Sequence, residues 1–154
     1  MLSAWRVVKT RYALSAFDGE GASVNPGRWN SRGVPVAYAS GSRSLALLEV
    51  LVHLQDAEVL PSFSFVGAAF PDDLVEVVAE PALPRDWRAS PARQATRDLG
   101  DRWVAEARSA VLRVPSTIIE EEHNYLINPA HPDFRLVRTI PPRIFALDRR
   151  LAEE

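Results

Sequence analysis

GRWNSRGVPVAYASGSRSLALLEVLVHLQ, residues 27–55, is the stretch that decides the fold class of this chain. Its middle part, 35–39, is a short β-rich run and is expected to form a strand. The hydroxyl of Ser42 can accept a hydrogen bond from a first-turn amide of the Leu- and Ala-rich run that follows, so a helix is expected from there to about Gln55. A strand that leads directly into an apolar helix is therefore the predicted centre of the domain.

The predicted helix carries one polar stripe. At about 100° per residue, Ser42, Glu49, His53 and Asp56 project from one side, whereas the leucines cover the rest. Glu49 is consequently a lone acid on a helix that is expected to be mostly buried. An acid on the open side of a helix more often simply faces water, so the helix alone leaves a structural and a functional role open.

The rest of the chain is dominated by short strands separated by turns. Strands are expected at 4–8, 63–70, 74–78, 111–114, 117–119, 135–140 and 143–147. A second helix is expected at 92–109, with Ser90 as its N-cap, Pro91 as its first residue and Gly100 as a weak point. Segments 17–33 and 79–89 are expected to be loops, and the first is long enough to bind or gate a ligand. Without a regular βαβ alternation, these elements indicate an α+β fold with a twisted sheet, or a split pair of sheets, flanked by helices.

Length and charge limit the possible classes of protein. The 154 residues fit a single domain, 1–154, with 47% hydrophobic and 25% charged residues, which excludes a disordered chain. Eighteen basic and 20 acidic residues give a net charge of -2, which argues against a dedicated nucleic-acid binder because counterion release needs a basic face. All the basic residues except Lys9 are arginine; genomic bias explains this most simply, although guanidinium groups also suit phosphates.

Compartment and site chemistry are limited by what the sequence lacks. Cysteine is absent, which excludes disulfides, thiolate metal sites and a cysteine nucleophile and fits a reducing compartment. No apolar run reaches the length of a membrane span and no signal core follows Met1, so a cytoplasmic protein is expected. GxGxxG, GxxxxGK[ST], HExxH and GxSxG do not occur, and His53, His123 and His131 are not spaced as metal ligands, so no metal site is expected.

Dispersed motifs carry the functional information. They are WRVV at 5–8, AFDGEGA at 16–22, GRWNSRGVPVAYAS at 27–40, LALLEVLVHL at 45–54, RVPS at 113–116 and NYLINPAHPDF at 124–134. In this order and spacing they resemble the RES domain family, toxins of bacterial toxin–antitoxin pairs that are named after an arginine, a glutamate and a serine. The resemblance covers most of the chain, whereas 57–110 matches only generically.

The resemblance implies a fold similar to that of ADP-ribosyltransferases and an enzyme that uses NAD as its substrate and cleaves the bond between nicotinamide and ribose. No metal is implied. Carried over by motif, the catalytic residues are Glu49, Arg28 and Tyr38, and the NAD-binding residues are Arg28, Tyr38, Ser116 and, as weaker matches, Asn124 and Arg6.

These residue types suit the implied chemistry. Breaking an N-glycosidic bond passes through an oxocarbenium-like transition state, whose positive charge a carboxylate such as Glu49 stabilises. Arg28 can hold a diphosphate with a bidentate fork. The ring of Tyr38 can stack on nicotinamide, and Ser116 can hydrogen-bond the ligand or orient Glu49. Without the resemblance, each of these residues has an ordinary structural interpretation.

Several functional hypotheses follow. The leading one is a toxin that depletes NAD by hydrolysis or phosphorolysis, and the alternative is a mono-ADP-ribosyltransferase that inactivates a cellular protein. A non-catalytic module that only binds its antitoxin is a second class. An RNA-cutting toxin is disfavoured, because the net charge of -2 and the lack of a His/Arg/Lys cluster provide neither steering nor acid–base groups. The resemblance implies an Xre-type antitoxin partner with a helix-turn-helix region, which covers the cleft and through which alone DNA is contacted.

Overall fold

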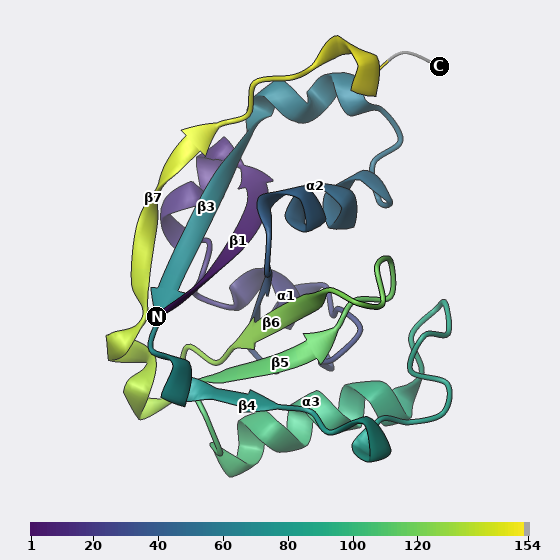
Figure 1. The fold of residues 1–154 in the computed structure, drawn as a ribbon, viewed down its shortest axis with the longest axis vertical. Coiled ribbons are helices and arrows are strands. Elements are labelled where there is room, and N and C mark those ends of the chain that lie inside the picture. Colours follow the sequence, from purple (N-terminus) through teal and green to yellow (C-terminus); the bar gives the residue numbers. More distant parts are fainter. Residues whose placement is uncertain (153–154) are drawn as a thin grey trace.

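The computed structural model describes residues 1–152, in which seven strands form one sheet in the order β4-β5-β6-β2-β1-β3-β7 (Figure 1). β4 and β5 run parallel, and the other neighbouring strands run antiparallel. The predicted α+β class is therefore confirmed. The strands are β1 (Leu2–Lys9), β2 (Ala37–Ser40), β3 (Phe63–Phe70), β4 (Val75–Val77), β5 (Val111–Pro115), β6 (His123–Ile127) and β7 (Arg138–Ile144).

Three α-helices accompany the sheet within residues 1–152, and short 3₁₀ segments join the elements. Ser42 caps α2 as expected, because its Oγ accepts a hydrogen bond from the amide of Leu45 at 3.1 Å. The helices are α1 (Glu20–Val24), α2 (Arg43–Leu51) and α3 (Gln94–Glu106), and the 3₁₀ segments are Thr10–Ser15, Ala57–Ser62, Asp72–Leu74, Glu80–Ala82, Pro132–Leu136 and Arg149–Leu151.

The sheet divides between β1 and β2. These two strands share a single register pair, Trp5 with Ser40, whereas β1 pairs with β3 along its whole length and β2 pairs fully with β6. Figure 1 shows β1, β3 and β7 in one half of the molecule and β4, β5 and β6 in the other. The sheet therefore opens between β1 and β2 beyond Trp5.

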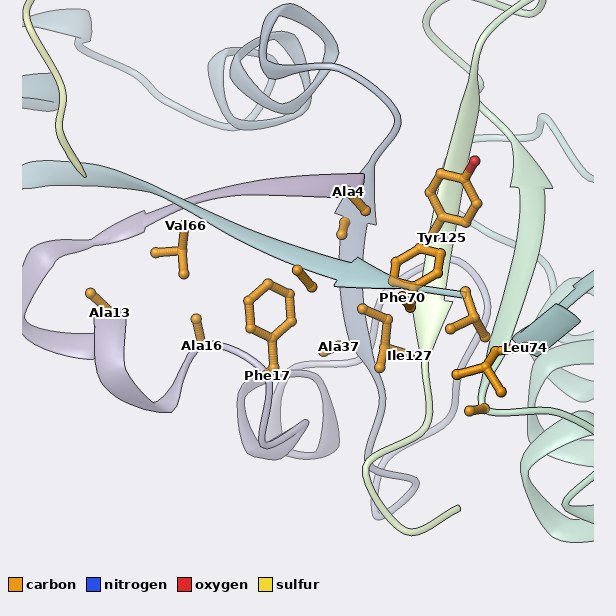
Figure 2. Packing of buried hydrophobic residues seen from close by; sticks show 14 residues of the cluster. Ala4, Ala13, Ala16, Phe17, Ala37, Val66, Phe70, Leu74, Tyr125 and Ile127 are labelled. Atoms are coloured by element: carbon orange, nitrogen blue, oxygen red, sulfur yellow. The ribbon is translucent and has the colours of Figure 1, made fainter. Parts of the chain in front are cut away.

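The largest hydrophobic cluster lies under the strands that meet at this division. Figure 2 shows Phe17, Phe70 and Tyr125 among small side chains from β1, β2 and β3. The rings of Phe70 and Tyr125 meet edge to face at 5.5 Å. Because Phe70 belongs to β3 and Tyr125 to β6, this cluster joins the two halves of the sheet.

Two smaller clusters attach the long helices. Trp103 of α3 is fully buried against Leu112 and Leu126 of the β5–β6 pair. Ala46 of α2 packs with Val7 and Phe63 on β1 and β3. Burying one large apolar side chain contributes about 1.5–3 kcal/mol, so each cluster fixes its helix on its half of the sheet.

Both long helices are shorter than predicted. α2 ends at Leu51 instead of Gln55, because the amides of His53 and Leu54 bond to the carbonyls of Val50 and Leu51, three residues back, and tighten into a turn. α3 begins at Gln94 instead of Pro91, since the segment before it is extended and Arg28 binds the carbonyl of Ala89. It ends at Glu106, where the left-handed Ala107 (φ 47°) stops it three residues early.

Other boundaries differ for local reasons. Segment 117–119 is a turn and not a strand, because the amides of Ile118 and Ile119 bond to Ser116 Oγ. The two strands expected at 135–140 and 143–147 are one strand, β7, whose two prolines are tolerated at the sheet edge. The expected loop at 17–33 contains the helix α1. The residues of β6 were expected to form turns, but they form a central strand of the sheet.

Candidate functional site

The opening between β1 and β2 forms part of a cleft with a volume of about 850 Å³. This size is within the range of about 300–1,000 Å³ that is typical of small-molecule sites. Ser116 is fully buried, and the other five predicted site residues line the cleft from five separate elements: Arg6, Arg28, Tyr38, Glu49 and Asn124.

One side of the cleft, the carboxylate wall, consists of Ser40, Glu49, Ser116 and Asn124. Glu49 Oε1 accepts a hydrogen bond from Asn124 Nδ2 at 2.6 Å and from Ser116 Oγ at 3.2 Å. Within residues 1–152, its other oxygen has no hydrogen-bond partner. Two donors therefore hold one carboxylate oxygen in place and leave the second oxygen available to a ligand.

Ser116 acts on Glu49 from below the cleft surface. Its Oγ accepts hydrogen bonds from the amides of Ile118 and Ile119 at 3.1 and 3.2 Å. A hydroxyl has two acceptor sites and one proton, so with both acceptor sites used the proton is directed to Glu49. This contact is compatible with the orienting role that the sequence suggests for Ser116.

Ser40 fixes the orientation of Asn124. Its Oγ donates to Asn124 Oδ1 at 2.8 Å, and the two residues are register partners on β2 and β6. With the amide oxygen bound to a donor, the amide nitrogen faces Glu49. Ser40 is 4% exposed, so water does not compete for this contact. The position of the carboxylate thus depends on three uncharged side chains around it.

A second part of the cleft, the arginine wall, consists of the 26–31 loop, the segment 87–92 and the first turns of α3. Arg28 Nη1 donates to the carbonyl oxygens of Trp87 and Ala89 at 2.8 and 2.6 Å. These two bonds use both protons of Nη1 and leave the Nε–Nη2 edge for a ligand. Burial lowers the pKa of Arg28 from its usual value, and the charge of Glu49 partly opposes this effect.

Tyr38 supports the arginine wall through its hydroxyl. The hydroxyl donates to Asn30 Oδ1 at 2.6 Å and accepts from the amide of Trp29 at 3.0 Å. A Cβ on Gly27 would lie 2.6 Å from Tyr38 Cζ, so the loop backbone rests on the ring. Burial raises the pKa of the Tyr38 phenol above its usual value. Its hydroxyl is therefore an anchor for the loop, and only the ring is left to contact a ligand.

Asn30 organises the turn that carries Arg28. It is fully buried, and its side chain accepts from the amide of Gly27 and donates to the carbonyls of Ala22 and Val34 at 2.8 and 3.1 Å. In this segment without helix or strand, the side chain of Asn30 thus binds the backbone groups that regular secondary structure would otherwise pair.

α3 holds the 26–31 loop from the outside. A Cβ at Gly100 would lie 1.7 Å from the carbonyl oxygen of Trp29, so only glycine permits this approach. Asp101 Oδ1 accepts from the amide of Ser31 at 2.8 Å, and Trp29 stacks on Trp87 with centroids 6.2 Å apart. Gly100, expected to weaken the helix, is instead the position where α3 and the loop meet.

Arg6 enters the cleft from β1. Its guanidinium lies 5.8 Å from the ring of Phe17, and burial lowers its pKa to about 10, with Asp18 opposing. The group therefore stays charged at neutral pH. Together with the arginine wall it makes the lining rich in cations: Arg6, Arg28, Arg88 and Arg97, beside the acid Glu49.

Sequence reasoning missed Ser40, Asn30 and Arg97. Ser40 and Asn30 belong to motifs that were recognised, and their polar types next to strand and loop ends were a usable signal. Arg97 lies in a segment that matched the family only generically. Within residues 1–152, no cluster of three or more His, Asp and Glu side chains could hold a metal ion. Over the same residues, no helix has the length and apolarity of a membrane span.

Known proteins are similar to this chain over nearly its whole length. Toxin Res of Yersinia enterocolitica is 38% identical over 148 residues, which cover 96% of this chain and 97% of that protein. The Prs ADP-ribosylating toxin of Sphingobium sp. is 38% identical over 154 residues, covering 97% of this chain and 96% of that protein.

The fold also has a solved counterpart. The crystal structure of the M. tuberculosis MbcT–MbcA toxin–antitoxin complex contains a chain that matches with a TM-score of 0.77 at 17% identity, over 94% of this chain and 84% of that one. The family model named RES domain matches residues 3–148. This match includes both walls of the cleft, and the chain therefore belongs to the RES domain family.

Proposed function

We propose that this protein is the toxin of a bacterial toxin–antitoxin pair, an enzyme that binds NAD and cleaves the bond between nicotinamide and ribose. The main support is the carboxylate of Glu49, which Asn124 and Ser116 hold in a cleft whose lining also includes four arginines. A single oriented acid among cations suits a substrate that carries phosphates and develops positive charge on its ribose.

Glu49 acts on the ribose. As the bond from ribose C1′ to the nicotinamide nitrogen breaks, nicotinamide leaves with the electron pair and becomes neutral, and positive charge develops on the ribose. The available oxygen of Glu49 stabilises that charge. An acceptor then forms a bond to C1′ and loses its proton. Asn124 and Ser116 keep the carboxylate in position, so it does not reorganise during the reaction.

Arg28 binds the diphosphate. Its Nη1 is engaged by two backbone carbonyls, which fix the plane of the guanidinium. The remaining edge offers two parallel N–H donors, the arrangement that suits a phosphate. The ring of Tyr38 provides apolar surface in the same cleft, whereas its hydroxyl serves Asn30 and Trp29. Tyr38 therefore contributes to binding and positioning and not to proton transfer.

The acceptor distinguishes two outcomes of the same first step. Transfer to water or phosphate depletes NAD, which is the proposed primary activity. Transfer to a protein side chain is the second candidate, and the relative named Prs ADP-ribosylating toxin favours it. The wide access to the cleft from the open end of α2, where Val52 and His53 are exposed, is compatible with either acceptor.

An antitoxin is the proposed partner. The structurally similar chain is part of a toxin–antitoxin complex, which supports an antitoxin partner. We infer an Xre-type antitoxin, cytoplasmic location, and contact with DNA only through that partner.

The test is NAD concentration over time with purified protein, with and without phosphate. NAD should fall and nicotinamide should appear in equal amount. Glu49→Gln should lower turnover at least 100-fold and leave NAD binding intact, because it removes charge and not shape. The matched control is Glu121→Gln, an exposed acid on the neighbouring turn.

The outcomes separate the candidates. Full activity of Glu49→Gln would contradict the role of Glu49. A product that requires phosphate identifies phosphorolysis. NAD loss only in the presence of cell extract, with ADP-ribose added to a protein by mass spectrometry, would identify the second candidate. No nicotinamide release under any of these conditions would contradict the proposed reaction.

A further inference from the structure

Arg97 projects from the face of α3 that meets the 26–31 loop. Gln94, Arg97 and Asp101 are three and four residues apart, which places them on one side of the helix. Two of them bind Ser31: the side chain of Gln94 reaches its hydroxyl at 3.4 Å, and Asp101 accepts from its amide at 2.8 Å. Arg97 lies between them and lines the cleft. The helix backbone at Arg97 is therefore held against the loop by contacts on both sides of it.

The guanidinium of Arg97 is incompletely satisfied. Its Nε is buried and has no hydrogen-bond partner within residues 1–152. The other cations of the arginine wall are engaged: Arg28 binds two carbonyls, and Arg88 pairs with Glu120 at 2.8 Å. A buried donor without a partner costs free energy, and a rotation of this guanidinium toward an anionic ligand in the cleft would remove that cost.

Arg28, Arg97 and Tyr38 all line the same cleft. The charges of both arginines act on the Tyr38 hydroxyl and favour its ionised form, against the larger effect of burial. Arg28 comes from the 26–31 loop and Arg97 from α3. These two elements touch through their backbones, because Gly100 of α3 lies against the carbonyl of Trp29. The backbones that carry Arg28 and Arg97 are therefore held together, and both side chains line the same cleft.

We propose that Arg97 is a second diphosphate-binding residue, which together with Arg28 contacts the two phosphates of a dinucleotide in the cleft. The ligand class is a nucleoside diphosphate with a second sugar attached. Each arginine supplies one fork, so the two charges of the diphosphate are matched one to one. This inference rests on the proposed function for the identity of the substrate, but the anion site itself does not need the cleavage reaction.

Equilibrium binding tests this assignment. In a Glu49→Gln background, which prevents turnover, Arg97→Gln should weaken the binding of NAD and of ADP-ribose at least tenfold. Nicotinamide riboside, which lacks phosphate, should bind equally well with and without Arg97. Arg102→Gln is the matched control, because Arg102 belongs to the same helix and is exposed. Thermal midpoints of all variants check that each of them is folded.

Each outcome decides between the two proposals. Unchanged NAD affinity in Arg97→Gln would overturn this inference and leave the proposed function standing. Equal losses for NAD and nicotinamide riboside would also overturn it, since a distorted cleft affects both. Arg97-dependent binding of ADP-ribose without nicotinamide release by the parent protein would support the anion site and contradict the proposed reaction. Failure of all three probes to bind the parent would contradict both.

Discussion

The two walls of the cleft are built in different ways. On the carboxylate wall, Asn124 and Ser116 donate to Glu49 and Ser40 donates to Asn124, so side-chain hydrogen bonds join residues 67 to 84 positions apart in the sequence. On the arginine wall, Arg28 is positioned by backbone: it binds two carbonyls, and its loop rests on the ring of Tyr38 and on α3.

This difference indicates how each wall should respond to substitution. A side-chain network can lose one member while the backbone stays in place, so changes in the carboxylate wall should affect turnover more than folding. A wall made of closely packed backbone has no such freedom, and changes there should affect stability and ligand binding together.

The largest effect on stability is expected at the contact between α3 and the loop. Gly100→Ala places a Cβ 1.7 Å from the carbonyl oxygen of Trp29, and neither backbone can move away independently. We expect the free energy of unfolding to fall by about 3 kcal/mol, despite the better helix propensity of alanine. Urea unfolding measures this. In Gly21→Ala the added methyl meets open space, so stability should not fall, and an equal loss in both variants would contradict the close contact.

Arg28→Ala should weaken the binding of NAD and should also make the arginine wall less ordered. Loss of charge-assisted hydrogen bonds of about 1.5–3 kcal/mol each should weaken NAD binding about 10- to 100-fold. The carbonyls of Trp87 and Ala89 lose their donor, so amide exchange in 87–92 should become faster. Calorimetry and hydrogen exchange measure the two effects. The control is Arg32→Ala, an exposed arginine of the same region; weaker binding there too would point to general charge instead of a specific fork.

Much of the fold could be predicted, because its signals are local. The Ser42 cap and the strand at 63–70 depend on adjacent residues and are confirmed. The strand predicted at 117–119 was wrong, because the amides there bond to the side chain of Ser116 and not to a neighbouring strand. β6 was missed because His123 and Asn124 are typical of turns, and only its place between β5 and β2 makes it a strand.

The members of the site were predictable only in part, and the contacts of their side chains were not. Motif order predicted the residues that the cleft brings together, whereas the partner of each hydroxyl and amide depends on tertiary structure. The clearest example is Tyr38, whose hydroxyl binds Asn30 eight residues earlier. Ser116 is another, since burial separates it from the cleft surface. Neither the hydrogen bond of Tyr38 nor the burial of Ser116 produces a periodicity or a spacing in the sequence from which it could be predicted.

Tyr38→Phe tests which wall Tyr38 serves. Without the hydroxyl, the amide of Trp29 loses its acceptor and Asn30 loses one donor. We expect the free energy of unfolding to fall by about 1–2 kcal/mol, and kcat to change by no more than a few-fold. Denaturant unfolding and steady-state kinetics measure these effects. Tyr12→Phe, at an exposed position, should change neither. A loss of kcat above 100-fold in a stable Tyr38→Phe protein would instead make the phenol a catalytic group.

Ser40→Ala should have the smallest effect, and its effect should be on turnover. The change removes the donor that fixes the amide oxygen of Asn124, but the bonds from Asn124 and Ser116 to Glu49 can still form. The carboxylate then spends part of its time misoriented, and we expect kcat to fall about fivefold, equivalent to about 1 kcal/mol, with KM unchanged. Ser44→Ala on the exposed side of α2 is the control. A rise in KM at constant kcat would show that Ser40 shapes the binding surface, and the carboxylate wall would then depend on packing in the same way as the arginine wall.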